Sequence, residues 1–202
     1  VIAVDELGNH ADLALDAIPA ADLFRRRERL RRRRLGGALA RAAGAATVIV
    51  AEPNPNRRRS IAEIAPYAVT VDPRTQDLQA VVGDLTDEGV GVDVALECVG
   101  LEASLNACAQ AVRRQGKVVQ TGLHMKPASV DAMLWALKDI TIEATWCYPV
   151  QIWPRIARLI ASGTFPVEKV ITGRIDAAEV VDKGFEALLD PSGKHLKIVV
   201  RT

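Results

Sequence analysis

Residues 47–52 read Thr-Val-Ile-Val-Ala-Glu, and this short stretch decides how the chain is organised. Val48 to Ala51 form a continuous apolar run, which is typical of a strand buried on both faces of a parallel sheet. An amphipathic segment follows, with Asn56 as the expected N-cap of its helix. From here to the C-terminus, strand-like and helix-like segments alternate about six times.

This alternation predicts an α/β fold, because parallel strands need crossover connections and a helix is the usual crossover. Asp176 and Glu179 have the spacing of a capping box at the start of the last helix. We therefore expect a doubly wound parallel sheet with helices on both faces. The expected strands cover 48–51, 68–71, 92–97, 117–121, 140–144, 170–175 and 196–200, and the expected helices cover 57–65, 77–85, 101–112, 130–137, 151–161 and 176–189.

Composition places the chain among ordinary globular proteins. It has 202 residues, of which 49% are hydrophobic and 25% charged, so it can bury a core and is not globally disordered. No apolar run is long enough to span a membrane, and the first twenty residues lack the pattern of a signal peptide, so we expect a cytoplasmic protein. Three cysteines without a CxxC pair argue against a disulfide framework and against a zinc site built from local motifs.

One segment departs from this ordinary composition. Arg25–Arg34 contains eight arginines and one glutamate. Such a block can bind nucleic acid or an acidic partner. No aromatic residues interleave with the arginines as stacking platforms would, so we favour a solvated segment and expect no nucleic-acid partner.

The candidate binding residues lie where the predicted strands end. In a doubly wound sheet, ligands bind beyond the carboxyl ends of the strands. Glu52 directly follows the strand at 48–51, where an acidic side chain can accept hydrogen bonds from the adenosine ribose and would repel a 2′-phosphate, which favours NAD over NADP. Arg57 lies close by and leaves the choice open, since an arginine can accommodate a 2′-phosphate.

Two further strand ends carry glycine, which allows a backbone to approach a ligand closely. Cys98-Val99-Gly100 follows one strand and Thr121-Gly122-Leu123 another. Glu97 also ends a strand, but we expect its side chain to point away from the cleft. Three such ends in one alternating series indicate a binding crevice better than any one of them alone.

The glycine-rich turn of a dinucleotide-binding fold is missing from its expected place. It should lie about 20 residues before Glu52, where the sequence has the arginine block. No apolar run precedes that block to serve as the first strand. We therefore expect a sheet that is incomplete at its N-terminal strand.

Several motifs in order resemble a known family. The segments 40–58, 91–100, 116–124, 138–146 and 193–200 are similar to the coenzyme-binding half of medium-chain zinc-dependent alcohol dehydrogenases, and among these to polyol dehydrogenases that act on diols such as 2,3-butanediol. The resemblance covers about 40–202. It implies a Rossmann-like fold, NAD as cofactor, and hydride transfer between NAD and a secondary alcohol.

The resemblance also implies roles and boundaries. Residues 39–167 would form the NAD-binding domain, 168–202 a C-terminal strand-helix-strand segment that packs on a GroES-like catalytic domain, and 1–38 match nothing in the family. The implied cofactor-binding residues are Glu52 at the adenosine ribose, Arg57 beside it, Cys98, Val99 and Gly100 in the cleft, and Thr121, Gly122 and Leu123 near the nicotinamide. By the same likeness, copies of the chain would pair through Thr141–Trp146 into a homo-oligomer.

The chain departs from the family in its first part. The family's zinc is expected, but this chain carries no recognisable zinc ligands and no catalytic residue that we can assign. An arginine run where a glycine-rich turn belongs is what a frameshift in GC-rich DNA would leave. We therefore expect a truncated or frameshifted dehydrogenase that is weakly active or inactive, with a non-enzymatic module that binds partners through Arg25–Arg34 as the alternative.

Overall fold

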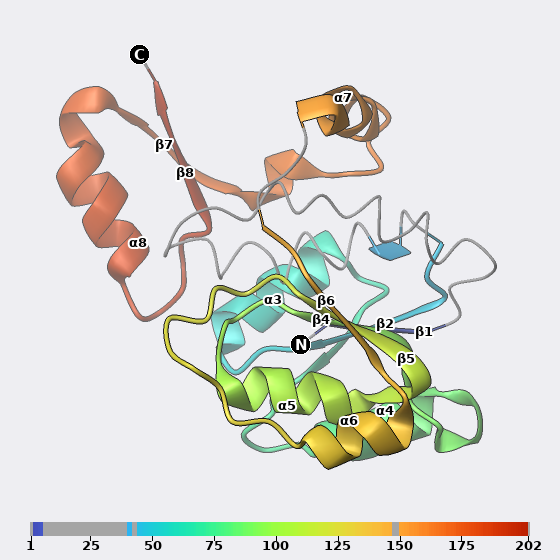
Figure 1. The fold of residues 1–202 in the computed structure, drawn as a ribbon. Coiled ribbons are helices and arrows are strands. Elements are labelled where there is room, and N and C mark those ends of the chain that lie inside the picture. Colours follow the sequence, from blue (N-terminus) through green and yellow to red (C-terminus); the bar gives the residue numbers. More distant parts are fainter. Residues whose placement is uncertain (1, 6–39, 42–43, 147–149, 202) are drawn as a thin grey trace.

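The computed structural model describes residues 2–5, 40–41, 44–146 and 150–201. Within these ranges a six-stranded sheet, in the order β3-β2-β1-β4-β5-β6, lies beside a separate two-stranded sheet, β7-β8 (Figure 1). The strand order is that of the Rossmann fold. The strands are β1 (Ile2–Asp5), β2 (Thr47–Ala51), β3 (Val69–Val71), β4 (Val92–Glu97), β5 (Val112–Gln120), β6 (Thr141–Ala144), β7 (Ile171–Asp176) and β8 (Lys197–Arg201).

The helices fall close to the predicted positions. No helix in the described ranges is long and apolar enough to cross a bilayer. The α-helices are α3 (Pro55–Ile64), α4 (Leu78–Leu85), α5 (Glu102–Ala111), α6 (Ala132–Lys138), α7 (Trp153–Ala161) and α8 (Ala187–Leu189); the remaining turns are η2 (Asp87–Gly89), η3 (Val150–Ile152), η4 (Val167–Val170), η5 (Ala177–Glu179) and the π-helical η6 (Val180–Glu186).

The α/β, Rossmann-like class is confirmed, but the centre of the sheet differs from the prediction. We expected the first strand position to stay empty and all pairing to be parallel. Instead β1 fills this position and pairs antiparallel with both neighbours, with Ile2 opposite Val50 of β2 and opposite Leu96 of β4. The other strands of the sheet are parallel to one another. Four residues carry too little periodicity to reveal a strand whose partners lie more than 40 residues away.

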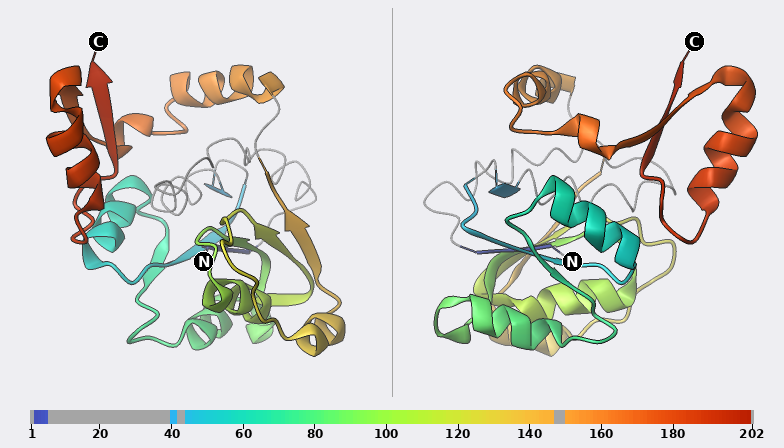
Figure 2. Two further views of the ribbon diagram at one scale, coloured as in Figure 1. Left: turned by 60° about the vertical axis from the view of Figure 1, so that its left-hand side comes forward. Right: turned by 180° about the vertical axis from the view of Figure 1, so that it is seen from behind.

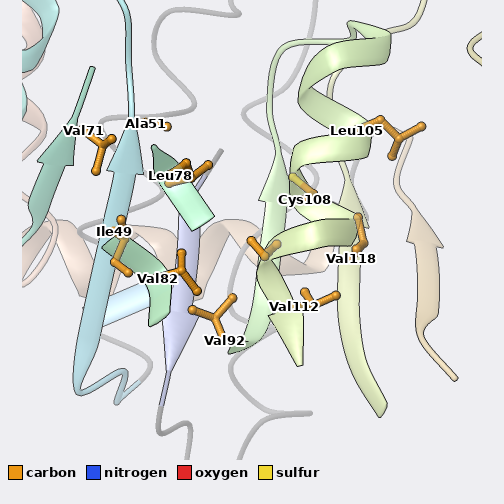
Figure 3. Packing of buried hydrophobic residues seen from close by; sticks show 12 residues of the cluster. Ile49, Ala51, Val71, Leu78, Val82, Val92, Leu105, Cys108, Val112 and Val118 are labelled. Atoms are coloured by element: carbon orange, nitrogen blue, oxygen red, sulfur yellow. The ribbon is translucent and has the colours of Figure 1, made fainter. Parts of the chain in front are cut away.

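Two apolar layers cover the faces of the sheet because successive strand residues point to opposite sides. Ile49 and Ala51 pack with Leu78 and Val82 of α4 and with Cys108 of α5 (Figure 3). On the other face, a second cluster buries strand residues against α3; it contains Val48, Val50, Ile61, Val94, Leu96, Cys98 and Val119. The helices therefore lie on both faces, as the uninterrupted apolar strands predict, and fix the strand ends that carry the candidate residues.

The loop after β2 corrects one helix boundary. We expected Asn56 as the N-cap of the next helix, but Asn54 occupies that position and its side chain accepts from the backbone N–H of Asn56 and Arg57. Pro55 follows at the first helical position, where its missing N–H costs no hydrogen bond. The helix therefore begins two residues earlier and brings Arg57 into its first turn.

The C-terminal sheet is separate from the six-stranded sheet (Figure 2), and residues that flank its strands contact α3. Ile64 of α3 belongs to a small apolar cluster with Phe165, Val170 and Leu196. The predicted capping box of Asp176 and Glu179 is confirmed at the start of η5. The proposed domain boundary between 167 and 168 stays a prediction.

Candidate functional site

Three parallel strands end in an acidic residue at the same edge of the sheet. Glu52 follows β2, Asp72 follows β3, and Glu97 is the last residue of β4. All three acidic residues are buried. Buried carboxyl groups need hydrogen-bond or charge partners, so their partners define what this edge can do.

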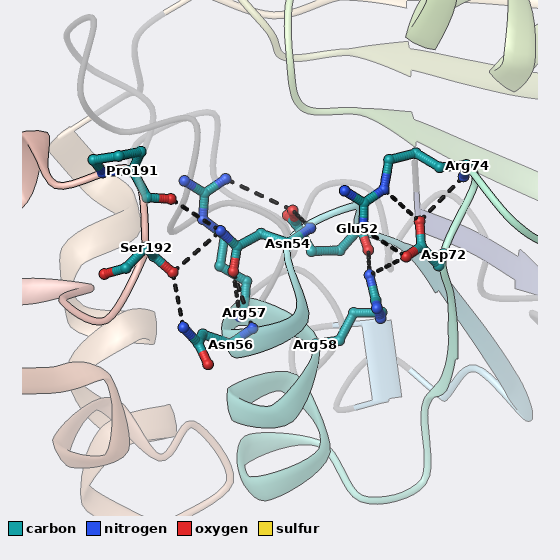
Figure 4. Close-up of polar contacts among 9 residues, drawn as sticks. All are labelled: Glu52, Asn54, Asn56, Arg57, Arg58, Asp72, Arg74, Pro191 and Ser192. Atoms are coloured by element: carbon teal, nitrogen blue, oxygen red, sulfur yellow. Dashed lines mark hydrogen bonds and ion pairs between the residues drawn. The ribbon is translucent and has the colours of Figure 1, made fainter.

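Glu52 lies where the sequence predicts it, directly after β2, but its side chain is buried. The residue is 1% exposed. Its Oε1 accepts from the backbone N–H of Asn54 at 3.0 Å, and Nη1 of Arg57 lies 3.6 Å from the same oxygen (Figure 4). The guanidinium of Arg58 donates to the backbone carbonyl of Glu52 at 2.7 Å. The structure thus brings the two predicted residues Glu52 and Arg57 together as an ion pair at the carboxyl end of β2.

Asp72 extends this cluster and was missed by the sequence reasoning. Arg74 donates to its carboxylate through Nε at 3.0 Å and Nη2 at 2.7 Å, and Nη1 of Arg58 lies 3.0 Å from Oδ2. The hydrogen bonds from Arg74 are the main reason why the pKa of Asp72 lies well below its ordinary range, with the charge of Arg58 adding to them. Asp72 also raises the pKa of Arg74. The signal that singled out Glu52, an acid after an apolar run, was present at Val69-Thr70-Val71-Asp72 as well.

Glu97, the last residue of β4, was expected to point its side chain away from the cleft. Its carboxyl group is fully buried between the two predicted loops. Oε1 accepts from the backbone N–H of Val99 at 2.8 Å and of Gly100 at 2.9 Å, and from Oγ of Ser104 at 2.6 Å. A glutamate that directly continues the buried strand at 92–96 needs hydrogen-bond partners for its carboxyl group. This position in the sequence was the signal that could have identified Glu97 as a residue of the site.

The backbone of the second loop is tied to the same residue. The N–H groups of Thr121 and Gly122 both donate to the carbonyl of Glu97, at 2.8 and 2.9 Å. With the amides of Val99 and Gly100 also taken, these four N–H groups cannot cradle a phosphate. This part of the crevice therefore suits an uncharged group better than an anion.

The predicted loop residues differ in how they face the crevice. The side chain of Cys98 packs in the apolar cluster on the α3 side of the sheet, so only its backbone can line the crevice. Thr121 turns its hydroxyl onto the carbonyl of Glu97 at 2.8 Å. Beside the loops, a cavity of about 370 Å³ opens; it is lined by Gly100, Leu101, Glu102, His124, Met125, Lys126 and Pro127.

The first strand position has a consequence for phosphate binding. Because β1 runs antiparallel, Ile2 rather than Asp5 lies level with the carboxyl ends of β2 and β4. In a dinucleotide-binding fold, the chain leaves the first strand at this edge and forms the turn that binds the pyrophosphate. The described part of β1 leads the chain to the opposite edge.

The arginine block Arg25–Arg34 lies outside the described residues. Among the residues that are described, no group of three or more His, Cys, Asp or Glu side chains is arranged to hold a metal ion. These residues therefore do not fit the family's zinc.

Sequence comparisons identify relatives over most of the chain. It is 30% identical over 162 residues to (R,R)-butanediol dehydrogenase of Bacillus subtilis (strain 168), which covers 80% of this chain and 45% of the relative. It is 34% identical over 167 residues to L-threonine 3-dehydrogenase of Pyrococcus abyssi, covering 82% and 47%. The chain thus spans about half the length of the curated relatives it matches.

Solved structures give the same result. The crystal structure of 2R,3R-butanediol dehydrogenase from Bacillus subtilis matches with a TM-score of 0.76 at 29% identity, over 82% of this chain and 46% of that one. A zinc-binding dehydrogenase from Sinorhizobium meliloti 1021, solved bound to NADP, matches with a TM-score of 0.69 at 25% identity, over 82% and 48%. The family model described as "Zinc-binding dehydrogenase" matches residues 35–162, more than half of the chain. The chain therefore belongs to the zinc-binding dehydrogenase family.

Proposed function

We propose that the chain binds NAD in the crevice at the carboxyl ends of β2, β4 and β5. The observation that carries this proposal is the carboxyl group of Glu52, which lies at the end of the strand next to the central one and is paired with an arginine side chain. An acid at this position accepts the hydroxyls of the adenosine ribose in dinucleotide-binding folds. Membership of a dehydrogenase family supports the same cofactor class.

Binding would exchange one partner of Glu52 for another. Arg57 lies in the first turn of α3 and reaches Oε1 of Glu52 at 3.6 Å, which is longer than a good hydrogen bond. The side chain of Arg57 is 20% exposed, so it would have to turn further toward solvent to release the carboxyl group. The two vicinal ribose hydroxyls would then donate to the carboxylate, while Asn54 keeps its backbone hydrogen bond to it.

The other end of the cofactor would lie against the two glycine-containing loops. Gly100 and Gly122 let the loops after β4 and β5 approach each other at backbone distance. The backbone of Val99 and Leu123 beside these glycines would form the wall against which the nicotinamide packs. When bound, NAD would supply the hydride acceptor for oxidation of an alcohol.

The choice between NAD and NADP follows from charge. The carboxylate of Glu52 would repel a 2′-phosphate, whereas Arg57 and Arg58 would attract one. We propose a preference for NAD, since Arg58 is already engaged by the carbonyl of Glu52 and by Asp72. Replacing Glu52 with Gln should then move the preference toward NADP.

A thermal-shift titration tests the proposal. NAD at saturating concentration should raise the melting temperature by mass action, and NADP should raise it less. Glu52→Gln should lose most of the NAD effect, while Asp84→Asn, an exposed change on α4, should keep it. No stabilisation by NAD, combined with nucleic-acid affinity that falls steeply with salt, would favour the alternative function of Arg25–Arg34.

The reaction of the whole protein is a further part of the proposal. We propose that this half serves an NAD-linked oxidation of secondary alcohols, with diols such as 2,3-butanediol as the substrate class, on the strength of the butanediol dehydrogenase relative. The expectation that the chain is weakly active or inactive stays a prediction. Mixing the protein with NAD and 2,3-butanediol and following NADH formation decides it.

We also propose that copies of the chain associate through β6. This strand is the last of the six-stranded sheet, and most of its residues and the following Trp146 are exposed. Such an edge offers backbone hydrogen bonds to a second strand. Sedimentation velocity should show a dimer that Ile142→Pro converts to a monomer; a wild-type protein that sediments as a monomer refutes the proposal.

A further inference from the structure

The carboxyl group of Glu97 is the most completely enclosed polar group at the crevice. The residue is 0% exposed and lies at the end of β4, the strand next to the centre of the sheet. Neither the proposed contact of the ribose with Glu52 nor the wall formed by the two loops uses it. A buried carboxyl group is costly unless it is well partnered, so its retention at this place needs a reason.

The partners of this carboxyl group come from one short turn and the helix after it. Val99 and Gly100 donate their backbone N–H, with Gly100 bridging both oxygens at 2.9 and 3.1 Å. Ser104 in the first turns of α5 adds its hydroxyl at 2.6 Å. Two backbone amides and a helix are thereby fixed to the end of one strand by a single side chain.

The loop after β5, residues 121–124, also contacts the carboxyl group of Glu97. Gly122 lies so close that a Cβ there would overlap Oε2 of Glu97 and the backbone nitrogen of Gly100. His124 follows in this loop, and its Nε2 lies 3.5 Å from Oε2 of Glu97. The carboxyl group therefore sits between the loops after β4 and β5 and contacts both.

The two loops lie at backbone contact distance. Gly100 has φ +74° and touches the backbone of Leu123 so closely that any side chain would overlap it. If the turn at 98–100 relaxed, the contact with 121–124 would be lost with it. Within the turn, the backbone N–H groups of both Val99 and Gly100 donate to Glu97.

We propose that Glu97 is a positioning residue, which holds the loops 98–100 and 121–124 at the separation that the nicotinamide half of the cofactor requires. It acts through the backbone of Val99 and Gly100 and does not itself touch the cofactor. This inference rests on the proposed function, because the loops are assigned to NAD there. A purely structural role would change stability without changing cofactor affinity, and this difference makes the inference testable.

Glu97→Gln is the informative variant because it keeps the volume and one acceptor oxygen. The NH₂ group of the glutamine replaces one carboxyl oxygen. The backbone N–H of Gly100 can then no longer donate to two oxygens, and it faces the NH₂ group, which is itself a donor. Asp93→Asn is the matched control on the same strand, since it removes an ion pair with Arg113 at 2.7 Å far from the loops. Both variants are compared with the wild type for NADH affinity by fluorescence titration and for amide hydrogen exchange at Val99 and Gly100.

The expected result separates the two variants. Glu97→Gln should bind NADH about tenfold more weakly, the change that follows when one charge-assisted hydrogen bond is lost, and should exchange the two amides faster. Asp93→Asn should leave both quantities unchanged. NADH affinity and exchange rates in Glu97→Gln equal to those of the wild type would overturn the inference.

Two other outcomes also give a decision. If Glu97→Gln does not fold, Ser104→Ala replaces it, because it removes one of the donors and leaves the carboxyl group in place; weaker NADH binding supports the inference and unchanged binding overturns it. If the wild type itself does not bind NADH, the proposed function fails. Amide exchange then decides the loop-holding role alone: faster exchange in Glu97→Gln supports it, and equal exchange overturns it.

Discussion

The strands β2 and β4 both end in a buried glutamate, and the two glutamates begin their contacts in the same way. The residue two positions later donates its backbone N–H to Oε1 in each case: Asn54 to Glu52 and Val99 to Glu97. The next residue makes the difference. It is Pro55 after Glu52, which has no N–H, and Gly100 after Glu97, which donates to both carboxyl oxygens.

This difference, together with the contacts of Ser104 and His124 with Glu97, separates the two carboxyl groups. Where Pro55 cannot donate, the side chain of Arg57 approaches Glu52 instead. A long side chain can give way to a ligand, whereas a backbone amide cannot leave without unfolding its turn. The comparison teaches that Glu52 is suited to exchange partners with a cofactor and that Glu97 is suited to hold its surroundings in place.

Replacing each glutamate with alanine should therefore have unequal effects. Glu97→Ala leaves two buried amides and a hydroxyl without their acceptor, and we expect a loss of about 4 kcal/mol in the free energy of unfolding. Glu52→Ala should cost about 1 kcal/mol, because Arg57 can turn to solvent. Urea denaturation of both variants measures the difference, and equal losses would contradict the comparison.

The contact between the loops gives a second prediction. A methyl group at Gly122 would overlap Gly100 and Glu97, so Gly122→Ala should lower the free energy of unfolding by about 3 kcal/mol. Gly83 in α4 has open space around it, and Gly83→Ala should instead stabilise by about 0.5 kcal/mol. A mild effect at Gly122 would show that the loops can separate.

The sequence predicted the fold where periodicity is strong. The apolar runs at 48–51 and 92–97 and the helices between them were correct to within a few residues, because burial on both faces leaves an unmistakable pattern. The antiparallel β1 was missed, since its four residues are recruited by long-range pairing and carry no local signal. Asn54 was missed as N-cap although Pro55 at the first helical position marks it.

The candidate site was predicted by position more than by contact. Glu52 lies at the predicted strand end, with Arg57 beside it. The partners of Glu97 could not be read from the sequence, because they depend on the conformation of a turn and on a loop that arrives 24 residues later. The roles of these residues in binding NAD stay predictions.

The ion pairs of Asp72 should make a smaller contribution to stability, and one that depends on pH. Arg74 and Arg58 hold the pKa of this carboxyl group below its ordinary value, so the ion pairs stabilise the fold above about pH 4 and lose that contribution as the pH falls toward the lowered pKa. Asp72→Asn should therefore be less stable than the wild type at neutral pH, and the gap should narrow at about pH 3. Urea midpoints at both pH values test this, and a gap that stays constant would show that the ion pairs contribute nothing.

The smallest effects concern how the end of β2 is tied to the C-terminal sheet. Asn54 caps α3 and also donates to the carbonyls of Pro191 and Ser192, at 3.2 Å each, while Asn56 donates to the carbonyl of Ser192 at 3.0 Å (Figure 4). Asn54→Ala should cost about 1.5 kcal/mol, because a cap and an inter-segment contact are both lost. Asn56→Ala should cost about 0.5 kcal/mol, because the exposed contact is lost while the cap remains.

Chemical denaturation measures both losses, and Asn106→Ala serves as the control for a half-buried asparagine that donates to a distant carbonyl, here that of Ser129. Amide exchange at Ser192 and Gly193 should rise in both Asn54→Ala and Asn56→Ala but not in Asn106→Ala. Equal losses for Asn54 and Asn56 would mean that the cap contributes little. The end of β2 would then owe its order to the C-terminal segment, in contrast to the end of β4, where the carboxyl group of Glu97 fixes its own turn.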